Sequence, residues 1–422
     1  MTRLTPALLI SVLAPATHAQ AGRCPGAPGA APYAIQTDGR FLKPVFAGVK
    51  ATKDIAYGEA VTDAGAKQTL LLDIFEPEGD AAPLRPAIVW LHGGSFRPEF
   101  TKNADGITRA AQTFARHGYV GVNIEYRARY DEARPMKKAI EDGMNDVMKA
   151  IAWVREHQAA YRIDAGFVAL AGQSAGGMLA GSFTSTANLS GAPRDRSGIF
   201  AQALFWGQPR HPNFPELHVK VDPCYPPTVF LTGNDDGQAP YTGALEMARE
   251  LNAAQVPARV QVVEEGGHSL PGREDEYVPM AARFLFEMLS KTRPVLPAEY
   301  QAEQYTRMRY AAFGKSATGF TGTGYIRLEK DSYIEWDYVD ALAAGEYSVV
   351  LRYSNPTHDL ITYGVRVNGA NQTVAAFEPA SGWATVRIGV ALKAGPNSIR
   401  LTAGTSPAGL RLDRIDLESK KQ

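Results

Sequence analysis

The sequence predicts an α/β protein with a doubly wound, mostly parallel sheet, followed by an all-β jelly-roll sandwich. Apolar runs such as 86–91 and 120–126 predict the first part, because strands buried on both faces lack polar alternation. Segments of helical periodicity separate these runs. Beyond residue 298 the helices end, and apolar residues recur at every second position. A chain of 422 residues is long enough for two such domains.

The charge balance and hydropathy exclude several classes of protein. Lys and Arg number 44, and Asp and Glu also number 44. A chain without excess positive charge lacks the usual signature of nucleic-acid binding, so we expect no nucleic-acid partner. After the N-terminus no apolar run approaches the ~20 residues that cross a bilayer, so we expect no membrane association.

The first 21 residues have the organisation of a signal peptide. Arg3 supplies a positive charge, residues 8–14 form a short apolar core, and small residues at 17–21 offer a cleavage site. We therefore expect export to the periplasm or outside the cell. The two cysteines, Cys24 and Cys224, could form one disulfide in that compartment or remain as two buried thiols.

The first domain, residues 22–292, alternates between predicted strands and predicted helices. Residues 23–60 are rich in Gly, Pro and Ala and show little periodicity, so no element is predicted there. Strands are predicted at 68–75, 86–91, 120–126, 168–171, 200–206, 227–232 and 258–263, and helices at 104–116, 139–158, 242–253 and 277–289. This alternation predicts a parallel sheet with its functional residues at the carboxyl ends of the strands.

One strand end carries the motif around which the domain is organised. Gly172-Gln173-Ser174-Ala175-Gly176 fits G-x-S-x-G, in which a serine sits on a sharp turn from strand to helix. The two glycines lack the Cβ atoms that would clash in such a strained turn. The turn raises the Ser174 hydroxyl above the sheet, and the N–H groups of the following helix point toward it. We therefore predict Ser174 as a nucleophile.

The loop after strand 86–91 is predicted to bind an oxyanion. Its sequence is His92-Gly93-Gly94-Ser95-Phe96. A Gly-Gly pair can turn backbone N–H groups toward the charge that develops on a reacting carbonyl. We expect the donors to be the N–H groups of Gly94, Ser95 and Ala175. His92 is expected to hold the loop by hydrogen bonds rather than to catalyse.

Two later strand ends supply a base and an acid. His268 follows a Gly-Gly pair after a late strand, and an imidazole can accept a serine proton near neutral pH. Asp235 and Asp236 are adjacent. Asp236, directly before a glycine, is favoured as the acid that orients the imidazole, and Asp235 is the alternative. Glu264 and Glu265 are weaker alternatives, because they lie on the histidine's own loop.

Residues 22–292 resemble the α/β-hydrolase superfamily, in particular its carboxylesterases and bacterial feruloyl esterases. The resemblance rests on 92–96, 126–127, 161–164, 172–177, Asp236 and His268. Ser95 stands where the commoner loop has a third glycine, and it keeps a backbone donor. The resemblance implies hydrolysis of carboxylic esters with no cofactor for catalysis. A serine peptidase of the same fold and a sugar-binding protein with a vestigial hydrolase are the alternatives.

The C-terminal part is predicted to be a β-sandwich over 299–422, after a linker at 293–298. Apolar residues alternate at 333–336, 347–353, 363–367 and 384–388. Turn residues at 345, 368–369 and 395–397 separate these segments.

This part resembles carbohydrate-binding modules of families six and thirty-five. The matching segments are 300–303, 344–347, 351–354, 367–369, 394–397 and 412–415. The resemblance implies a structural Ca²⁺ ion held by Gln301, Glu303 and Asp413, whose oxygen atoms suit that cation. It also implies sugar stacking on Trp383 and Tyr325, unless these rings are buried in the core.

The sequence as a whole predicts an exported serine carboxylesterase. The appended module directs the expectation toward acyl groups, acetyl or feruloyl, on a polysaccharide. One position departs from the modules it resembles, because Ala408-Gly409-Leu410 replaces a frequent asparagine. Sugar binding by the module and a spacer role therefore both stay open.

Overall fold

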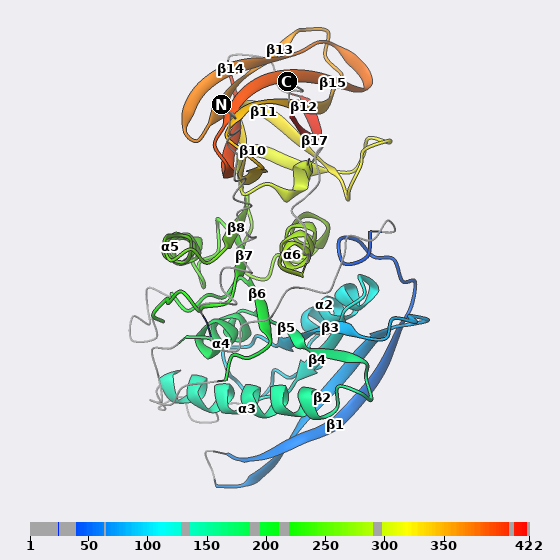
Figure 1. Ribbon diagram of the computed structural model, residues 1–422, viewed down its shortest axis with the longest axis vertical. Coiled ribbons are helices and arrows are strands. Elements are labelled where there is room, and N and C mark those ends of the chain that lie inside the picture. The colour runs from blue at the N-terminus through cyan, green and yellow to red at the C-terminus, as the bar shows by residue number, and fades with distance from the viewer. Residues whose placement is uncertain are drawn as a thin grey trace, which may run out of the picture.

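The computed structural model describes residue 24 and residues 39–62, 65–127, 136–185, 195–210, 219–289, 298–404 and 409–419. Two domains lie one above the other along its long axis, with residues 39–289 in the lower domain and 298–419 in the upper (Figure 1). The predicted signal peptide, residues 1–21, lies outside the described residues. So does all of the predicted linker except Ala298. Both stay predictions.

The lower domain is built on a sheet with strand order β1-β2-β4-β3-β5-β6-β7-β8. The strands are β1 (Val49–Val61), β2 (Lys67–Pro77), β3 (Arg85–Leu91), β4 (Val120–Ile124), β5 (Ile163–Gln173), β6 (Ile199–Phe205), β7 (Thr228–Gly233) and β8 (Ala258–Val263). The pairs β1–β2 and β2–β4 are antiparallel. The other pairs are parallel.

Helices cover both faces of this sheet. They are α2 (Asp105–Arg116), α3 (Met136–Glu156), α4 (Ala175–Phe183), α5 (Tyr241–Ala253) and α6 (Glu274–Leu289). Side chains of β3 alternate between the two faces: Ile88 and Trp90 pack with α2 and α6, whereas Val89 and Leu91 pack with α3, α4 and α5. Every residue of β3 is buried, as its unbroken apolar run predicts. The prediction of a doubly wound, mostly parallel sheet is confirmed.

Strand β1 corrects the prediction that residues 23–60 contain no regular element. It is a 13-residue strand at the outer edge of the sheet, antiparallel to β2. Two register shifts interrupt its pairing, and most of its side chains are partly or fully exposed. An edge strand with bulges has no continuous buried face, so its sequence lacks the alternation by which strands are recognised.

The upper domain is a two-layered β-sandwich. Its elements are β9 (Ala298–Gln301), the 3₁₀ turn η2 (Ala302–Gln304), β10 (Arg307–Gly314), β11 (Tyr325–Ala341), β12 (Gly345–Asn355), β13 (Ile361–Val367), β14 (Ala370–Phe377), β15 (Ala380–Leu392), β16 (Gly395–Ala403) and β17 (Leu410–Ser419). One layer has the order β15-β12-β17-β9 and the other β14-β13-β16-β11-β10. The predicted all-β sandwich is confirmed.

The sandwich docks on the β8 edge of the lower sheet, opposite the edge formed by β1. Strand β10 continues that sheet by a parallel bridge to β8, in which the N–H of Val262 donates to the Thr306 carbonyl oxygen at 2.9 Å. Beside it, the Arg259 guanidinium lies 3.9 Å from the ring centre of Tyr338 and pairs with Glu287 of α6. An apolar core runs without interruption from α6 into the sandwich. The docking therefore covers a sheet edge that would otherwise expose unpaired backbone groups.

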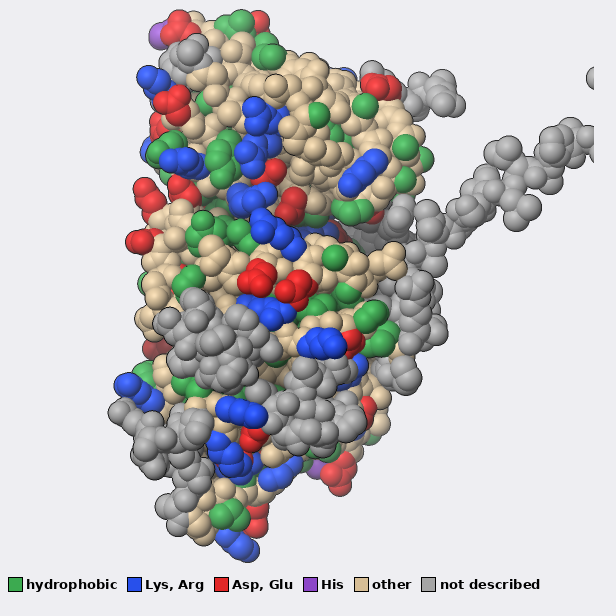
Figure 2. Space-filling model, turned by 90° about the vertical axis from the view of Figure 1, so that its left-hand side faces the viewer, with side chains coloured by type: hydrophobic (Ala, Val, Ile, Leu, Met, Phe, Trp, Pro, Cys, Tyr) green, Lys and Arg blue, Asp and Glu red, His purple; other side chains and the backbone are tan. Residues whose placement is uncertain are grey.

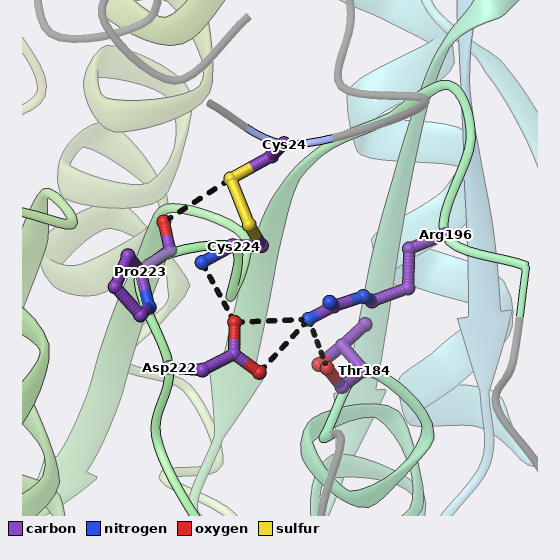
Figure 3. The surroundings of a disulfide bond; sticks show 6 residues. All are labelled: Cys24, Thr184, Arg196, Asp222, Pro223 and Cys224. Atoms are coloured by element: carbon purple, nitrogen blue, oxygen red, sulfur yellow. Dashed lines mark hydrogen bonds and ion pairs between the residues drawn. A yellow bond between two sulfur atoms is a disulfide. The ribbon is translucent and has the colours of Figure 1, made fainter. Parts of the chain in front are cut away.

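Cys24 and Cys224 form a disulfide bond, which decides between the two alternatives left by the sequence (Figure 3). The N–H of Cys224 donates to the Asp222 carboxylate at 2.7 Å. Arg196 pairs with the same carboxylate and donates to the carbonyl oxygen of Thr184, which caps α4. The disulfide therefore fastens the N-terminal part of the chain to the loop behind helix α4.

Candidate active site

The turn between β5 and α4 places Ser174 in a strained conformation. Its φ is 51° and its ψ is −119°, and its N–H donates to the Phe205 carbonyl oxygen at 2.9 Å. A Cβ atom on Gly172 would lie 2.2 Å from the carbonyl oxygen of Gly176. One on Gly176 would lie 2.1 Å from that of Leu91. The turn therefore requires glycine at both positions, as the motif predicts.

Three side chains from three loops meet at this turn. The Oγ atom of Ser174 lies 2.9 Å from Nε2 of His268, and Nδ1 of the same ring lies 2.9 Å from Oδ2 of Asp236. The His268 side chain is 16% exposed, whereas that of Asp236 is fully buried. A serine proton can therefore pass to Nε2, while the carboxylate holds the proton on Nδ1 and faces the positive charge that results.

The surroundings of Asp236 keep its carboxyl group ionised. Burial raises its pKa, but hydrogen bonds from His268 and from the backbone N–H groups of Ala239 and Gln238 outweigh that effect and lower it. Oδ1 accepts both N–H groups at 2.8 Å. Asp235, in contrast, has an exposed side chain, and its N–H donates to the carbonyl oxygen of Gly266. The arrangement favours Asp236 over its neighbour.

The loop that carries His268 lies tightly against the end of β7. A Cβ atom on Gly233 would lie 1.9 Å from the carbonyl oxygen of Gly266. On the far side of the histidine, Ser269 and Leu270 adopt φ angles of 74° and 42°. Left-handed backbone at two successive non-glycine residues is costly, so the surrounding packing must hold this loop in place.

The loop after β3 presents its backbone to Ser174. Gly94, Ser95 and Phe96 have φ angles of 108°, 54° and 61°. A Cβ atom on Gly93 would lie 3.2 Å from Cβ of Ser174, so this loop lies against the serine. Gly94 and Ser95, the two predicted donors of the loop, follow Gly93 directly, and Ala175 is the first residue of α4. Their role as oxyanion donors stays a prediction.

His92 is part of the support for that loop. Its ring is 1% exposed and stacks on Tyr126, with 4.2 Å between ring centres. The Tyr126 hydroxyl donates to the His92 carbonyl oxygen at 2.6 Å, and Glu125 lies 3.4 Å from Nε2. These contacts are those of a residue that positions the loop.

Sequence reasoning missed one residue of this site. A Cβ atom on Gly207 would lie 2.0 Å from the carbonyl oxygen of Ser174. Gly207 follows Trp206, whose φ of 38° turns the chain at the end of β6. The signal in the sequence is a glycine directly after a predicted strand, but many loops share it.

The three residues predicted to hold Ca²⁺ lie around one loop of the sandwich. The Thr321 hydroxyl lies 2.9 Å from both Gln301 Oε1 and Asp413 Oδ2. Glu303 is fully buried, and its Oε2 has no hydrogen-bond partner within the described residues. Burial raises the pKa of Glu303 to about 7, and the Asp413 carboxylate adds to this rise. Arg352 pairs with Asp413. An unpartnered buried oxygen next to a second carboxylate fits a cation.

A different kind of metal site finds no support in the part of the chain that the structure describes. No cluster of three or more His, Cys, Asp or Glu side chains there could hold a metal ion.

The described helices also include none that is both long and apolar enough to cross a membrane.

The two predicted stacking aromatics differ in exposure. Tyr325 is 2% exposed, and its hydroxyl lies 2.8 Å from that of Ser316. Its ring therefore presents no face to a sugar, which corrects that part of the prediction: the residue begins β11 and points into the domain. Trp383 is half-buried, contacts the Tyr325 ring edge-on at 5.8 Å, and donates to the Thr318 carbonyl oxygen at 2.8 Å.

Comparison with known proteins finds matches to parts of this chain. A family model described as BD-FAE matches residues 72–197, which include the loop after β3 and the turn at Ser174. An exo-β-D-glucosaminidase of Amycolatopsis orientalis is 35% identical over 130 residues, 29% of this chain and 12% of that protein. Carboxylesterase 3B of Mus musculus is 32% identical over 125 residues, 28% of this chain and 20% of that protein. The chain thus spans a fifth or less of these relatives.

Among solved structures, a family 35 carbohydrate-binding module from Clostridium thermocellum is similar to part of this chain. It is 30% identical, with a TM-score of 0.28, and the match covers 30% of this chain and all of that module. For the lower domain, the strand order, the turn at Ser174 and the BD-FAE match agree. The lower domain, residues 39–289, has the predicted α/β-hydrolase fold, and its residues 72–197 are similar to the BD-FAE family.

Proposed function

We propose that this chain is a serine carboxylesterase that acts through an acyl-enzyme. The observation that carries the proposal is the pair of 2.9 Å contacts that join Ser174, His268 and Asp236 in one line. A hydroxyl is a poor nucleophile unless a base takes its proton, and this arrangement supplies both the base and the acid behind it.

The reaction follows from the protons that these groups can hold. Ser174 Oγ attacks the ester carbonyl carbon while His268 Nε2 takes the hydroxyl proton. The N–H groups of Gly94, Ser95 and Ala175 stabilise the oxyanion. The protonated imidazole then gives its proton to the departing alcohol, and an acyl-serine remains. Water, activated by the same histidine, releases the acid.

We further propose that the natural substrate carries its acyl group, such as acetyl or feruloyl, on a polysaccharide. The sandwich and its likeness to a carbohydrate-binding module support this substrate class. The disulfide supports export, because such bonds persist in oxidising compartments.

The sandwich is proposed to hold a structural Ca²⁺ ion through Gln301, Glu303 and Asp413. The unpartnered Oε2 of Glu303 supports this assignment. Calcium chloride should raise the unfolding temperature of the chelator-treated protein, and Glu303→Gln should abolish that rise. An equal rise in this variant would place calcium elsewhere.

The test of the esterase is hydrolysis of p-nitrophenyl acetate, p-nitrophenyl octanoate, methyl ferulate and acetylated xylan by the wild type and by Ser174→Ala. The variant should lose a factor on the order of 10⁴ or more in kcat. Preference among the four esters identifies the acyl group. A wild type without turnover on any of them would refute the esterase and direct attention to peptide substrates.

A further inference from the structure

A groove lies at the seam between the two domains and plays no part in the chemistry described above. Its volume is about 480 Å³, and it is open to solvent. The histidine loop contributes Glu264 and Glu265, and strands β10 and β11 contribute Tyr310, Arg327 and Lys330. Figure 2 shows a face of the molecule on which basic and acidic side chains gather near the level where the two domains meet.

The topology places this groove at the edge of the sheet that carries the active site. Strand β10 runs parallel to β8, with Arg307 opposite Val262, and continues past the carboxyl end of β8. Tyr310 follows three residues later. On the other side, Glu265 precedes His268 by three residues, so their Cα atoms are at most about 11 Å apart. A ligand in the groove therefore lies close to the histidine loop.

Tyr310 is presented to solvent by an irregularity in its strand. Pairing of β10 with β11 shifts register between Arg309 and Ala311, and Tyr310 has a φ of 49°. A left-handed conformation is costly for an aromatic residue, and bulges of this kind turn a side chain in a new direction. As a result, Tyr310 is 52% exposed, one of the most exposed large hydrophobic side chains in the described residues.

The Tyr310 ring contacts the side chain of the neighbouring Arg309. The Arg309 guanidinium lies 4.6 Å from the ring centre and donates to the phenol oxygen at 2.9 Å. Glu264 of the histidine loop lines the same groove as Tyr310. Its carboxylate accepts from Asn234 at 2.7 Å, in the loop just before Asp235. Glu264 thus connects the groove to the loop that carries the acid.

The polar groups around the ring suit a neutral ligand rich in hydroxyl groups. The side chains of Glu265 and Lys330 are exposed, and within the described part of the chain they form no hydrogen bond or ion pair. Arg327 pairs with Glu329 at 2.6 Å. Charges of both signs line the groove, so neither an anion nor a cation is attracted as a whole. Carboxylates accept hydrogen bonds from the hydroxyl groups of a ligand, and the Lys and Arg side chains donate hydrogen bonds to its hydroxyl oxygens.

We propose that this groove is a saccharide-binding subsite in which Tyr310 stacks on a sugar ring. An exposed aromatic face with donors and acceptors at its rim matches the apolar face and hydroxyl edge of a pyranose. The sugar bound there is the backbone of the acylated chain, and only this last point rests on the proposed function. The subsite is separate from Trp383, because no residue of β15, the strand that contains Trp383, lines it.

The test is binding of xylohexaose and cellohexaose to the full chain, measured by calorimetry in a Ser174→Ala background. Tyr310→Ala should weaken binding of the preferred saccharide about tenfold, which corresponds to about 1.4 kcal/mol. Tyr310→Phe, which keeps the ring, should bind within about twofold of the parent. Val374→Ala, at a 59% exposed apolar position on β14, is the matched control and should bind as the parent does.

The outcomes separate this subsite from the other features of the protein. Trp383→Ala in the same background tests the separate sugar contact predicted at Trp383. It should leave the loss of affinity caused by Tyr310→Ala unchanged. Unchanged affinity in Tyr310→Ala, or no binding of either saccharide by the parent, would overturn the proposal. Because the background variant has no nucleophile, failure of the esterase proposal would not alter this measurement. Unfolding temperatures of all variants check that the exposed substitutions preserve the fold.

Discussion

Replacing Asp236 by asparagine is expected to lower kcat by a factor of about 10²–10⁴ without unfolding the protein. Oδ1 of Asp236 accepts the N–H groups of Gln238 and Ala239, so an asparagine oxygen will be held on that side. Its NH₂ group then faces Nδ1 of His268. A donor at that point favours the tautomer with its proton on Nε2, and that nitrogen can no longer accept the Ser174 proton.

The magnitude follows from the interactions that are lost. The imidazolium loses a hydrogen bond to a charged partner, which is worth about 1.5–3 kcal/mol. The reactive tautomer leaves two donors facing each other, at a further cost of about 1–3 kcal/mol for a buried hydrogen bond that is not made. Together these terms reach about 2.5–6 kcal/mol, which corresponds to a rate factor of about 10²–10⁴.

The assay is kcat for p-nitrophenyl acetate, with Asp235→Asn as the matched control. The Asp235 side chain is exposed and its backbone hydrogen bond to Gly266 survives the change, so its rate should stay within about twofold of wild type. Full activity in Asp236→Asn would refute the reasoning. A loss in Asp235→Asn instead would identify the neighbour as the acid.

Three further predictions concern stability and the turn at Ser174. Replacing Cys24 and Cys224 by serine opens a loop of 200 residues and should cost up to about 5 kcal/mol, measured as a lower urea midpoint; an unchanged midpoint would contradict this. Burial lowers the pKa of His117 from 6.5 to about 4. The stability that the neutral ring contributes is therefore present above pH 6.5 and is lost as the pH falls toward 4. The free energy of unfolding should fall by at most about 3 kcal/mol over this range. Urea titrations of His117→Gln should lack this part of the pH dependence. Gly207→Ala places a Cβ 2.0 Å from the Ser174 carbonyl oxygen, so ester turnover should fall at least about tenfold, and a rate equal to wild type would show that β6 can move aside.

The buried central strand and the turn at Ser174 could be predicted from the sequence, because the physical constraints there act on residues close together in the chain. Strand β3 is buried on both faces and is apolar throughout, and the turn at Ser174 needs glycine two residues away on each side. Strand β1 escaped prediction because it lies at an exposed edge. Tyr325 was misjudged because alternation along a strand does not tell which of its two faces is buried.

The docking of the sandwich could not be predicted from the sequence, since it depends on contacts between residues far apart in the chain. Glu276 of α6 is fully buried, accepts the hydroxyl of Tyr305 from the sandwich, and pairs with Arg273. Arg273 in turn lies 3.4 Å from the carbonyl oxygen of Glu264, which lines the groove together with Tyr310. The sandwich thus contacts the loop that carries His268.

This docking changes how the role of the sandwich must be tested. A module on a flexible linker can be deleted, and the loss then reports only on substrate capture. Here deletion would uncover the edge of β8 and remove Tyr305, so the Glu276 carboxyl would lose its hydroxyl donor. Loss of activity after truncation would therefore not distinguish a sugar-binding module from a support for the histidine loop. Point substitutions at the exposed Tyr310 and the half-buried Trp383 make that distinction, because neither residue contributes to the buried contacts between the domains.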